Sequence, residues 1–195
     1  MPICILAFSL SFKNPVLLTK EVEVDETFIG GKEGNRHYNK KKKVTVGSAK
    51  ADKIVVLGLI ERNGKVIAKV ITNTKAESIL PVIDKHVEKG ATMLTDEWYA
   101  YGQVDKLGYQ HKTIQHNLKI YVVGKTHTNT IENFWRVLKR GLYGIYHFTS
   151  EKHLNRYLDE FTARYNTREL GNEERFEKFL GQSDLRLKYQ TLIQN

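Results

Sequence analysis

The 195-residue chain carries 31 lysines and arginines against 22 acidic residues, a formal net charge of +9, and 41% of its residues are hydrophobic. These values predict one folded domain with a substantial core and a polyanionic partner, with nucleic acid favoured over a membrane surface or the ribosome. The single cysteine, Cys4, excludes an intrachain disulfide framework and a cysteine-rich zinc site, and it indicates a reducing compartment, the cytosol.

The chain opens with the apolar stretch MPICILAFSLSF, which has no basic residue ahead of it and is too short to span a membrane. It therefore predicts neither a signal peptide nor a membrane segment. We expect residues 1–18 to be a poorly ordered leader or the remnant of a longer N-terminus.

Residues 20–29 alternate as a strand does. One face carries Val22, Val24 and Phe28, and the other carries Glu21, Glu23, Asp25 and Thr27. A solvated sheet face is the favoured interpretation of these acids, although aspartate is disfavoured inside a strand. Residues 32–52 predict a basic loop in which Lys41 and Lys42 are candidates for contacting DNA phosphates, with a solvated loop tip as the alternative.

The next segments predict a hairpin and two units of helix followed by strand. The β-branched runs 54–60 and 66–71 flank an Asn-Gly turn. Thr74 and Glu77 predict a capping box for a helix that Pro81 would kink or start and that Gly90 would end. A strand at 92–95 would then deliver Asp96 at its carboxyl end, where open α/β sheets bind ligands. A helix at 98–107 and a strand at 109–115 follow.

Residues 127–140 combine acidic, basic and apolar side chains on one predicted helix. The helical spacing that gives a buried face is met by Ile131, Phe134, Trp135 and Leu138. Lys139 follows Glu132 by two turns, so both project from nearly the same side. The alternative is purely structural, with Asn129 as N-cap and Glu132 as its capping-box partner. Another amphipathic helix is predicted after Thr149 or Ser150, on the spacing of Leu154, Tyr157, Leu158, Phe161 and Tyr165.

This order of elements is that of a ribonuclease-H-like α/β domain, whose mixed five-stranded sheet has three antiparallel strands and then two parallel crossovers, flanked by helices. We expect this domain to span residues 19–170 and a helical tail to span 171–195. In such a fold Asp25 lies on the central strand, Asp96 ends the neighbouring strand, and Glu132 lies on the helix packed over both.

Three converging carboxylates disfavour joint ionisation unless a cation lies between them. The expected occupant is Mg²⁺, replaceable by Mn²⁺ and present as two ions, because hard divalent cations prefer oxygen ligands and a pair of them supports phosphodiester cleavage. Lys139 would then meet a DNA phosphate as a point charge, and Arg136 and Arg140 on the same helix are further candidates for DNA contact.

Three stretches, VEVDETFIGGK, LTDEWYAYG and HTNTIENFWRVLKRGLYGIYHFTSEKHLNRYLDEFTARYNTRE, resemble the signature blocks of bacterial insertion-sequence DDE transposases. The resemblance covers residues 20–170, and 35 residues separate Asp96 from Glu132, as in that superfamily. It implies that Asp25, Asp96 and Glu132 form the catalytic metal triad, with Lys139 as the accompanying basic residue. Because some relatives use asparagine as the third ligand, Asn129 and Asn133 are weaker candidates.

The resemblance also implies partners and a location. These are double-stranded DNA, both element ends and target, a homo-oligomer assembled on that DNA, and the bacterial cytosol in association with the nucleoid. Members of the group often begin with an N-terminal zinc ribbon, which these 195 residues lack. We therefore expect either a truncated copy or recognition of the element ends by another region.

Several alternatives stay open at this point. The function could be that of a ribonuclease-H-like nuclease without strand transfer, or of an inactive transposase remnant that only binds DNA. Scattered histidines (His111, His116 and His127) could form a zinc set but are more often structural. Aromatic residues (Trp98, Tyr99 and Tyr101) could stack on bases but are more often core, and Trp135 is assigned to packing.

Overall fold

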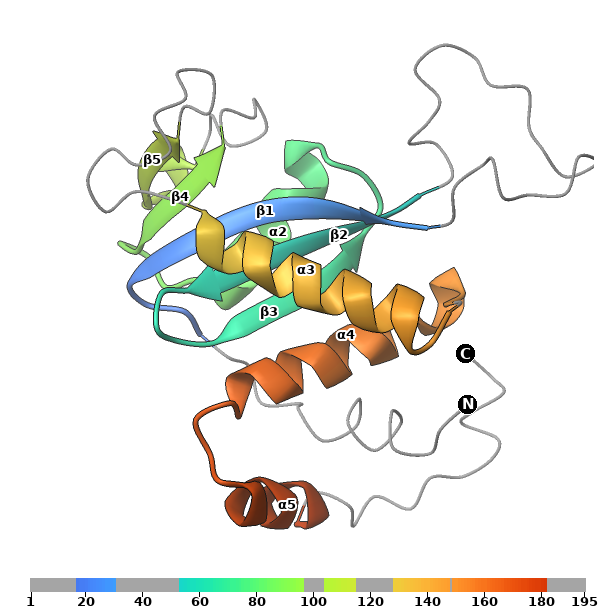
Figure 1. Ribbon diagram of the computed structural model, residues 1–195. Coiled ribbons are helices and arrows are strands. Elements are labelled where there is room, and N and C mark those ends of the chain that lie inside the picture. The colour runs from blue at the N-terminus through green and yellow to red at the C-terminus, as the bar shows by residue number, and fades with distance from the viewer. Residues whose placement is uncertain (1–16, 31–52, 97–103, 115–127, 148, 182–195) are drawn as a thin grey trace, which may run out of the picture.

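The computed structural model describes residues 17–30, 53–96, 104–114, 128–147 and 149–181. They build a five-stranded sheet in the order β3-β2-β1-β4-β5 (Figure 1). Its strands are β1 (Glu21–Ile29), β2 (Ile54–Glu61), β3 (Val66–Ile71), β4 (Thr92–Asp96) and β5 (Gln110–Ile114). The pairs β1·β2 and β2·β3 are antiparallel, whereas β1·β4 and β4·β5 are parallel.

This topology is that of a ribonuclease-H-like α/β fold, as the order of the sequence elements predicts. The hairpin β2–β3 is fixed by the Asn63-Gly64 turn, in which Asn63 adopts a left-handed φ of 56°. The parallel strand β4 requires a crossover connection, and α2 (Ala76–His86) supplies it. The prediction of three antiparallel strands followed by two parallel ones is confirmed.

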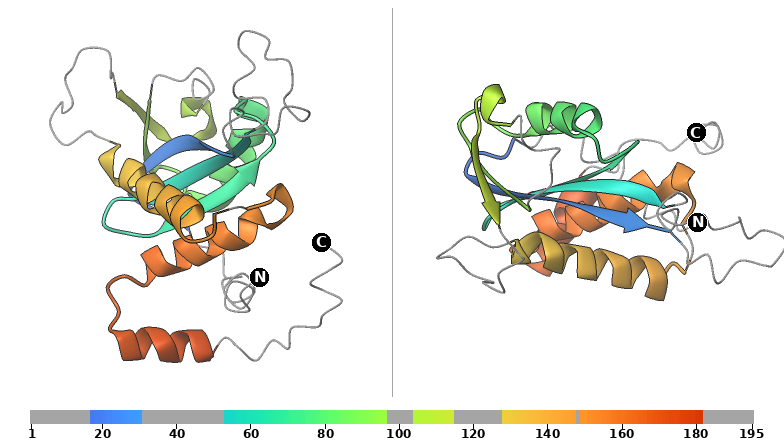
Figure 2. Two further views of the ribbon diagram at one scale, coloured as in Figure 1. Left: turned by 45° about the vertical axis from the view of Figure 1, so that its right-hand side comes forward. Right: turned by 90° about the horizontal axis from the view of Figure 1, so that it is seen from above.

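Helices cover both faces of the sheet. Figure 2 shows α2 on one face and α3 (Asn129–Gly144) with α4 (Glu151–Asn166) on the other, while α5 (Asn172–Leu180) lies beyond α4. Each face has its own apolar core. The α2 side gathers Ile79 and Ile83 over Val22, Val24 and Met93, and the other side gathers Ile131, Phe134, Trp135, Leu138, Leu154, Leu158 and Phe161 over Ile29, Val56 and Ile60.

α4 also protects the exposed edge of the sheet, which would otherwise present unpaired backbone groups. The Asn166 amide oxygen accepts from the Val66 backbone N–H at 2.7 Å, and the Asn166 amide nitrogen donates to the Val66 carbonyl at 3.0 Å. The predicted amphipathic face of this helix is confirmed: Leu154 and Leu158 are fully buried. The register of α4 along β3 is thus set by polar as well as apolar contacts.

Some predicted boundaries were wrong. The predicted N-cap at Thr74 is one residue too early, because α2 begins at Ala76 with Lys75 at the N-cap position, and the Asn73 side chain accepts from the Lys75 N–H. Pro81 lies inside α2 rather than at its start. α2 ends at His86, before Gly90, since Val87 turns extended and bridges to Leu18.

Leu18 itself is fully buried in the core, so the folded domain includes the last residue of the expected leader. The predicted helix 98–107 falls mainly outside the described residues, and its described end is a 3-10 turn at Asp105–Leu107.

No helix in the described ranges combines the length and the apolar character needed to cross a membrane.

Candidate active site

The acidic face of β1 is only partly solvated, which corrects the favoured interpretation of its acids: the Glu21 side chain is 45% exposed, but Asp25 is half-buried. α3 crosses this face, and Glu23 is 0% exposed. The Glu23 carboxylate accepts from the Ile131 backbone N–H and the Thr130 hydroxyl, both at 3.0 Å, and from Arg62 Nε at 3.1 Å. A buried carboxylate needs this degree of compensation, because an unpaired charge in the interior is strongly destabilising.

These contacts replace the capping box predicted for α3. Thr128 is the N-cap and makes no side-chain capping bond, while Asn129 is the first helical residue. The first backbone N–H groups of a helix lack intrahelical partners, and here Glu23 from β1 satisfies that of Ile131. Since the positive end of the helix dipole also favours an anion, Glu23 anchors the start of α3 to the sheet. The purely structural role proposed for Glu132 is therefore not the one that the fold uses.

Asp25 lies two residues further along β1 and is half-buried under α3. Its Oδ2 accepts a hydrogen bond of 3.0 Å from the indole Nε1 of Trp135. Trp135 is 5% exposed, so its assignment to packing is confirmed but incomplete. The indole reaches Asp25 over Gly58, the register partner of Asp25 on β2.

Asp96 is the last residue of β4, directly beside β1. The register of the two strands pairs Glu21 with Thr92 and Glu23 with Leu94 in parallel. Carried two residues further, this register sets Asp25 level with Asp96, although the two strands no longer pair there. The backbone thus brings the two predicted ligands to the same level of neighbouring strands, while the Asp96 side chain lies outside the described part.

Glu132 and Lys139 are both half-buried on α3, as their spacing predicts. Glu132 is 41% exposed and forms an ion pair of 3.6 Å with Arg136. Burial lowers the pKa of the Lys139 ammonium, the Asp25 carboxylate acts in the opposite direction, and Lys53 adds to the lowering. Lys139 therefore lies within electrostatic reach of Asp25.

The other candidate residues either are exposed on α3 or lie outside the described residues. Asn129, Asn133, Arg136 and Arg140 are exposed on α3 and free to approach a ligand from solvent. Lys41 and Lys42 lie outside the described residues, as do His116, His127, Trp98, Tyr99 and Tyr101. Within the described ranges no three histidine, cysteine or acidic side chains form a group able to hold a metal ion, so the triad stays a prediction.

His111 has a structural partner. Its Nε2 lies 2.7 Å from the hydroxyl of Thr95, which is fully buried, and its backbone N–H donates to Asp105 at 3.1 Å. The first bond ties β5 to β4 one residue before Asp96, and the second ties β5 to the 3-10 turn at Asp105–Leu107. The structural interpretation of this histidine agrees with its position.

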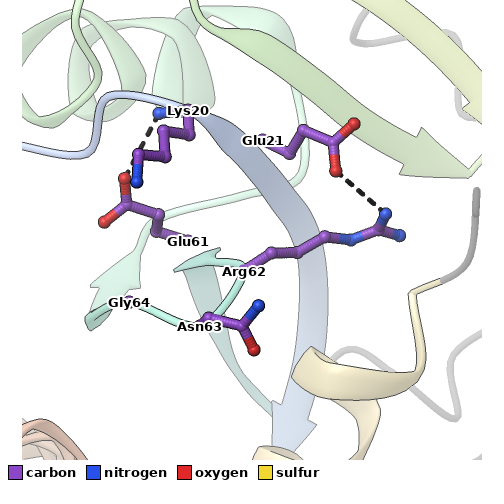
Figure 3. A pocket seen from close by; sticks show the side chains of 6 residues that line it. All are labelled: Lys20, Glu21, Glu61, Arg62, Asn63 and Gly64. Atoms are coloured by element: carbon purple, nitrogen blue, oxygen red, sulfur yellow. Dashed lines mark hydrogen bonds and ion pairs between the residues drawn. The ribbon is translucent and has the colours of Figure 1, made fainter.

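Sequence reasoning missed three residues of this region, namely Glu23, Arg62 and Gly58. Figure 3 shows Arg62 beside a pocket of about 380 Å³ at the β2–β3 turn, reaching across β1 to Glu21, with an ion pair of 3.1 Å. The pocket is lined by Lys20, Glu21, Glu61, Arg62, Asn63 and Gly64, none of which was a predicted site residue. Gly58 carried the available signal, since glycine inside a β-branched strand marks a close approach.

Comparison with known proteins identifies the family of this chain. The chain is 28% identical over 109 residues to an uncharacterized transposase-like protein of Haemophilus influenzae, an alignment that covers 56% of this chain and 87% of that protein. Residues 17–166, which include all of β1 to α4, match the ISXO2-like transposase domain. The chain therefore belongs to the family of ISXO2-like transposase domains.

Proposed function

We propose that this protein is a transposase that cuts DNA strands at the ends of an insertion sequence and joins them to target DNA. The proposal is carried by the parallel register of β1 and β4, which pairs Glu23 with Leu94 and, continued by two residues, brings Asp25 level with Asp96. The helix that carries Glu132 crosses the same face of β1, and the chain belongs to a transposase family.

The side chains present suit hard divalent cations. Asp25, Asp96 and Glu132 offer only oxygen donors, which Mg²⁺ and Mn²⁺ prefer over nitrogen or sulfur. Two such ions, when bound, would activate the attacking oxygen and stabilise the leaving oxygen of a phosphodiester. Asn129 is the alternative third ligand, because it lies in the first turn of α3 and is exposed.

The basic residues of α3 suit the DNA backbone. Lys139, Arg136 and Arg140 lie on this helix, with Arg136 in an ion pair with Glu132, and the net charge of +9 favours a polyanion. Lys139 would hold a phosphate next to the scissile bond, since it lies within reach of the Asp25 charge. We infer double-stranded DNA as the substrate, a homo-oligomer assembled on it, and action in the bacterial cytosol at the nucleoid.

The decisive experiment incubates the purified protein with a labelled duplex carrying the element end, an unlabelled target duplex, and Mg²⁺ or Mn²⁺. Joined products support the proposal. Nicked DNA without joining would indicate a nuclease instead, and bound but intact DNA would indicate a protein that only binds. Asp25→Asn is the control, because it keeps the side-chain shape and removes the anionic ligand; strand joining by this variant would refute the assignment of Asp25.

A further inference from the structure

The indole of Trp135 makes a contact that packing alone does not require. Its apolar neighbours on the buried face of α3, Phe134 and Leu138, fill the same core without any polar group. Trp135 adds one donor, and that donor meets the Asp25 carboxylate at 3.0 Å. A hydrogen bond to a charged acceptor is stronger and more directional than one between neutral groups. The contact therefore restrains how the carboxylate can turn.

The sheet is shaped to admit this ring. A Cβ atom added at Gly58 would lie 2.6 Å from Cη2 of Trp135, closer still to Cζ2, and 3.0 Å from Cδ1 of Ile131. No real Cβ tolerates such distances, so any other residue at position 58 would displace the indole. Gly58 is also the register partner of Asp25. The space that holds the indole and the carboxylate that accepts its hydrogen bond therefore lie side by side on neighbouring strands.

The position of Trp135 on α3 gives the contact a second consequence. Glu132 precedes it by three residues and Lys139 follows it by four, so these residues are its neighbours on the helix surface. A bond that fixes Trp135 against β1 also fixes the rotation of α3 about its axis. Both neighbours are thereby held at set positions relative to Asp25.

We propose that Trp135 is a positioning residue of the metal site, which orients the Asp25 carboxylate through its indole N–H and aligns Glu132 and Lys139 through the rotation of α3. This inference rests on the proposed function, because it takes Asp25 as a metal ligand. Groups that hydrogen-bond a ligating carboxylate typically change metal affinity by about 10- to 100-fold when they are removed. Trp135, whose indole N–H lies 3.0 Å from the Asp25 carboxylate, is placed to do so.

The test measures binding of Mn²⁺ to the whole chain without DNA, by the loss of the free-ion electron paramagnetic resonance signal. Trp135 is replaced by phenylalanine and, in a second variant, by benzothienylalanine, which keeps the ring shape but has sulfur in place of N–H. Both variants should bind Mn²⁺ about tenfold or more weakly. The isosteric variant keeps the ring packing, so its melting temperature should fall less than that of Trp135→Phe. Leu142→Ala, two turns further along the same buried face, is the matched control: it should lose stability but keep Mn²⁺ affinity.

The outcomes separate the inference from the proposed function. Unchanged Mn²⁺ affinity in the benzothienylalanine variant, with affinity lost in Asp25→Asn, would overturn the positioning role and leave Asp25 as a ligand. Equal affinity in wild type and Asp25→Asn, or no Mn²⁺ binding at all, would overturn both. Weaker binding in Leu142→Ala equal to that of the Trp135 variants would show general destabilisation and would also overturn the inference.

Discussion

Replacing Gly58 by alanine perturbs the one point where β2, α3 and Asp25 meet. The added methyl group would overlap the six-membered ring of Trp135, with Cη2 only 2.6 Å away, and would press on Ile131. Both are side chains in a packed core, so we expect the substitution to cost about 1–3 kcal/mol of unfolding free energy through overpacking. For a chain of this size, the melting temperature should fall by about 2–4 °C per kcal/mol. The sign of the change in unfolding free energy is informative, because replacing glycine by alanine inside a strand otherwise stabilises a protein slightly.

A double-mutant cycle with Trp135→Phe identifies the cause. Phenylalanine lacks the ring atoms Cζ2 and Cη2, so the alanine methyl group should fit in the space that they vacate. Urea unfolding of wild type, both single variants and the double variant should then give a favourable coupling of about 1–3 kcal/mol. Gly144→Ala is the control, since nothing lies within 4 Å of that position, and it should be neutral or stabilising. Additivity within about 0.5 kcal/mol, or a neutral Gly58→Ala, would refute the argument.

The other predictions concern the site and one buried carboxylate. Glu132→Gln should abolish strand cleavage but change the free energy of unfolding by less than about 0.5 kcal/mol, because the Glu132–Arg136 ion pair is half-exposed. Retained cleavage would instead make Asn129 the candidate for the third ligand. Lys139→Ala should weaken DNA binding and reduce the slope of log K against log salt by about 0.9, measured by fluorescence anisotropy, and an unchanged slope would exclude a phosphate contact. Tyr146 donates to the Glu160 carboxylate, and burial followed by that contact raises the pKa of its phenol to about 12 from 10.0. Because the folded-state pKa is the higher one, the phenol stabilises the fold fully below pH 10.0 and loses this effect as the pH rises toward 12. In urea unfolding, Tyr146→Phe should cost about 1–3 kcal/mol at pH 7 and less at pH 11; an equal loss at both pH values would contradict the assignment.

The sheet could be predicted from the sequence because its signals are local. β3 has the bounds that its β-branched run predicts, and the Asn63-Gly64 turn fixes the hairpin before it. The buried face of α3 follows from helical spacing in the same way. Boundaries failed where a tertiary contact decides them, as at α2, whose end is set by the bridge between Val87 and Leu18.

The sequence predicts ligands for the site but not the residues that support them. Alternation along β1 shows which face is polar, but not that a helix more than 100 residues later covers that face. The partners of Glu23 and Asp25 therefore could not be read from the strand. Gly58 gives part of this information. A glycine inside a strand predicts that another group approaches the backbone closely, but it does not identify that group as the Trp135 ring.

Strand β1 and helix α3 hold each other through two carboxylates. Glu23 satisfies the first turn of the helix, and the helix in return supplies the indole that satisfies Asp25. Neither contact needs a metal ion or DNA, because both are made by the chain alone. Arg62 and the N-terminus of α3 offset the cost of burying the Glu23 carboxylate. Glu23 therefore has a structural role, whereas Asp25 is only half-buried. We therefore expect the relative setting of Asp25 and α3 to be established when the domain folds, which is the preorganisation that the proposed metal-dependent strand-transfer site would require.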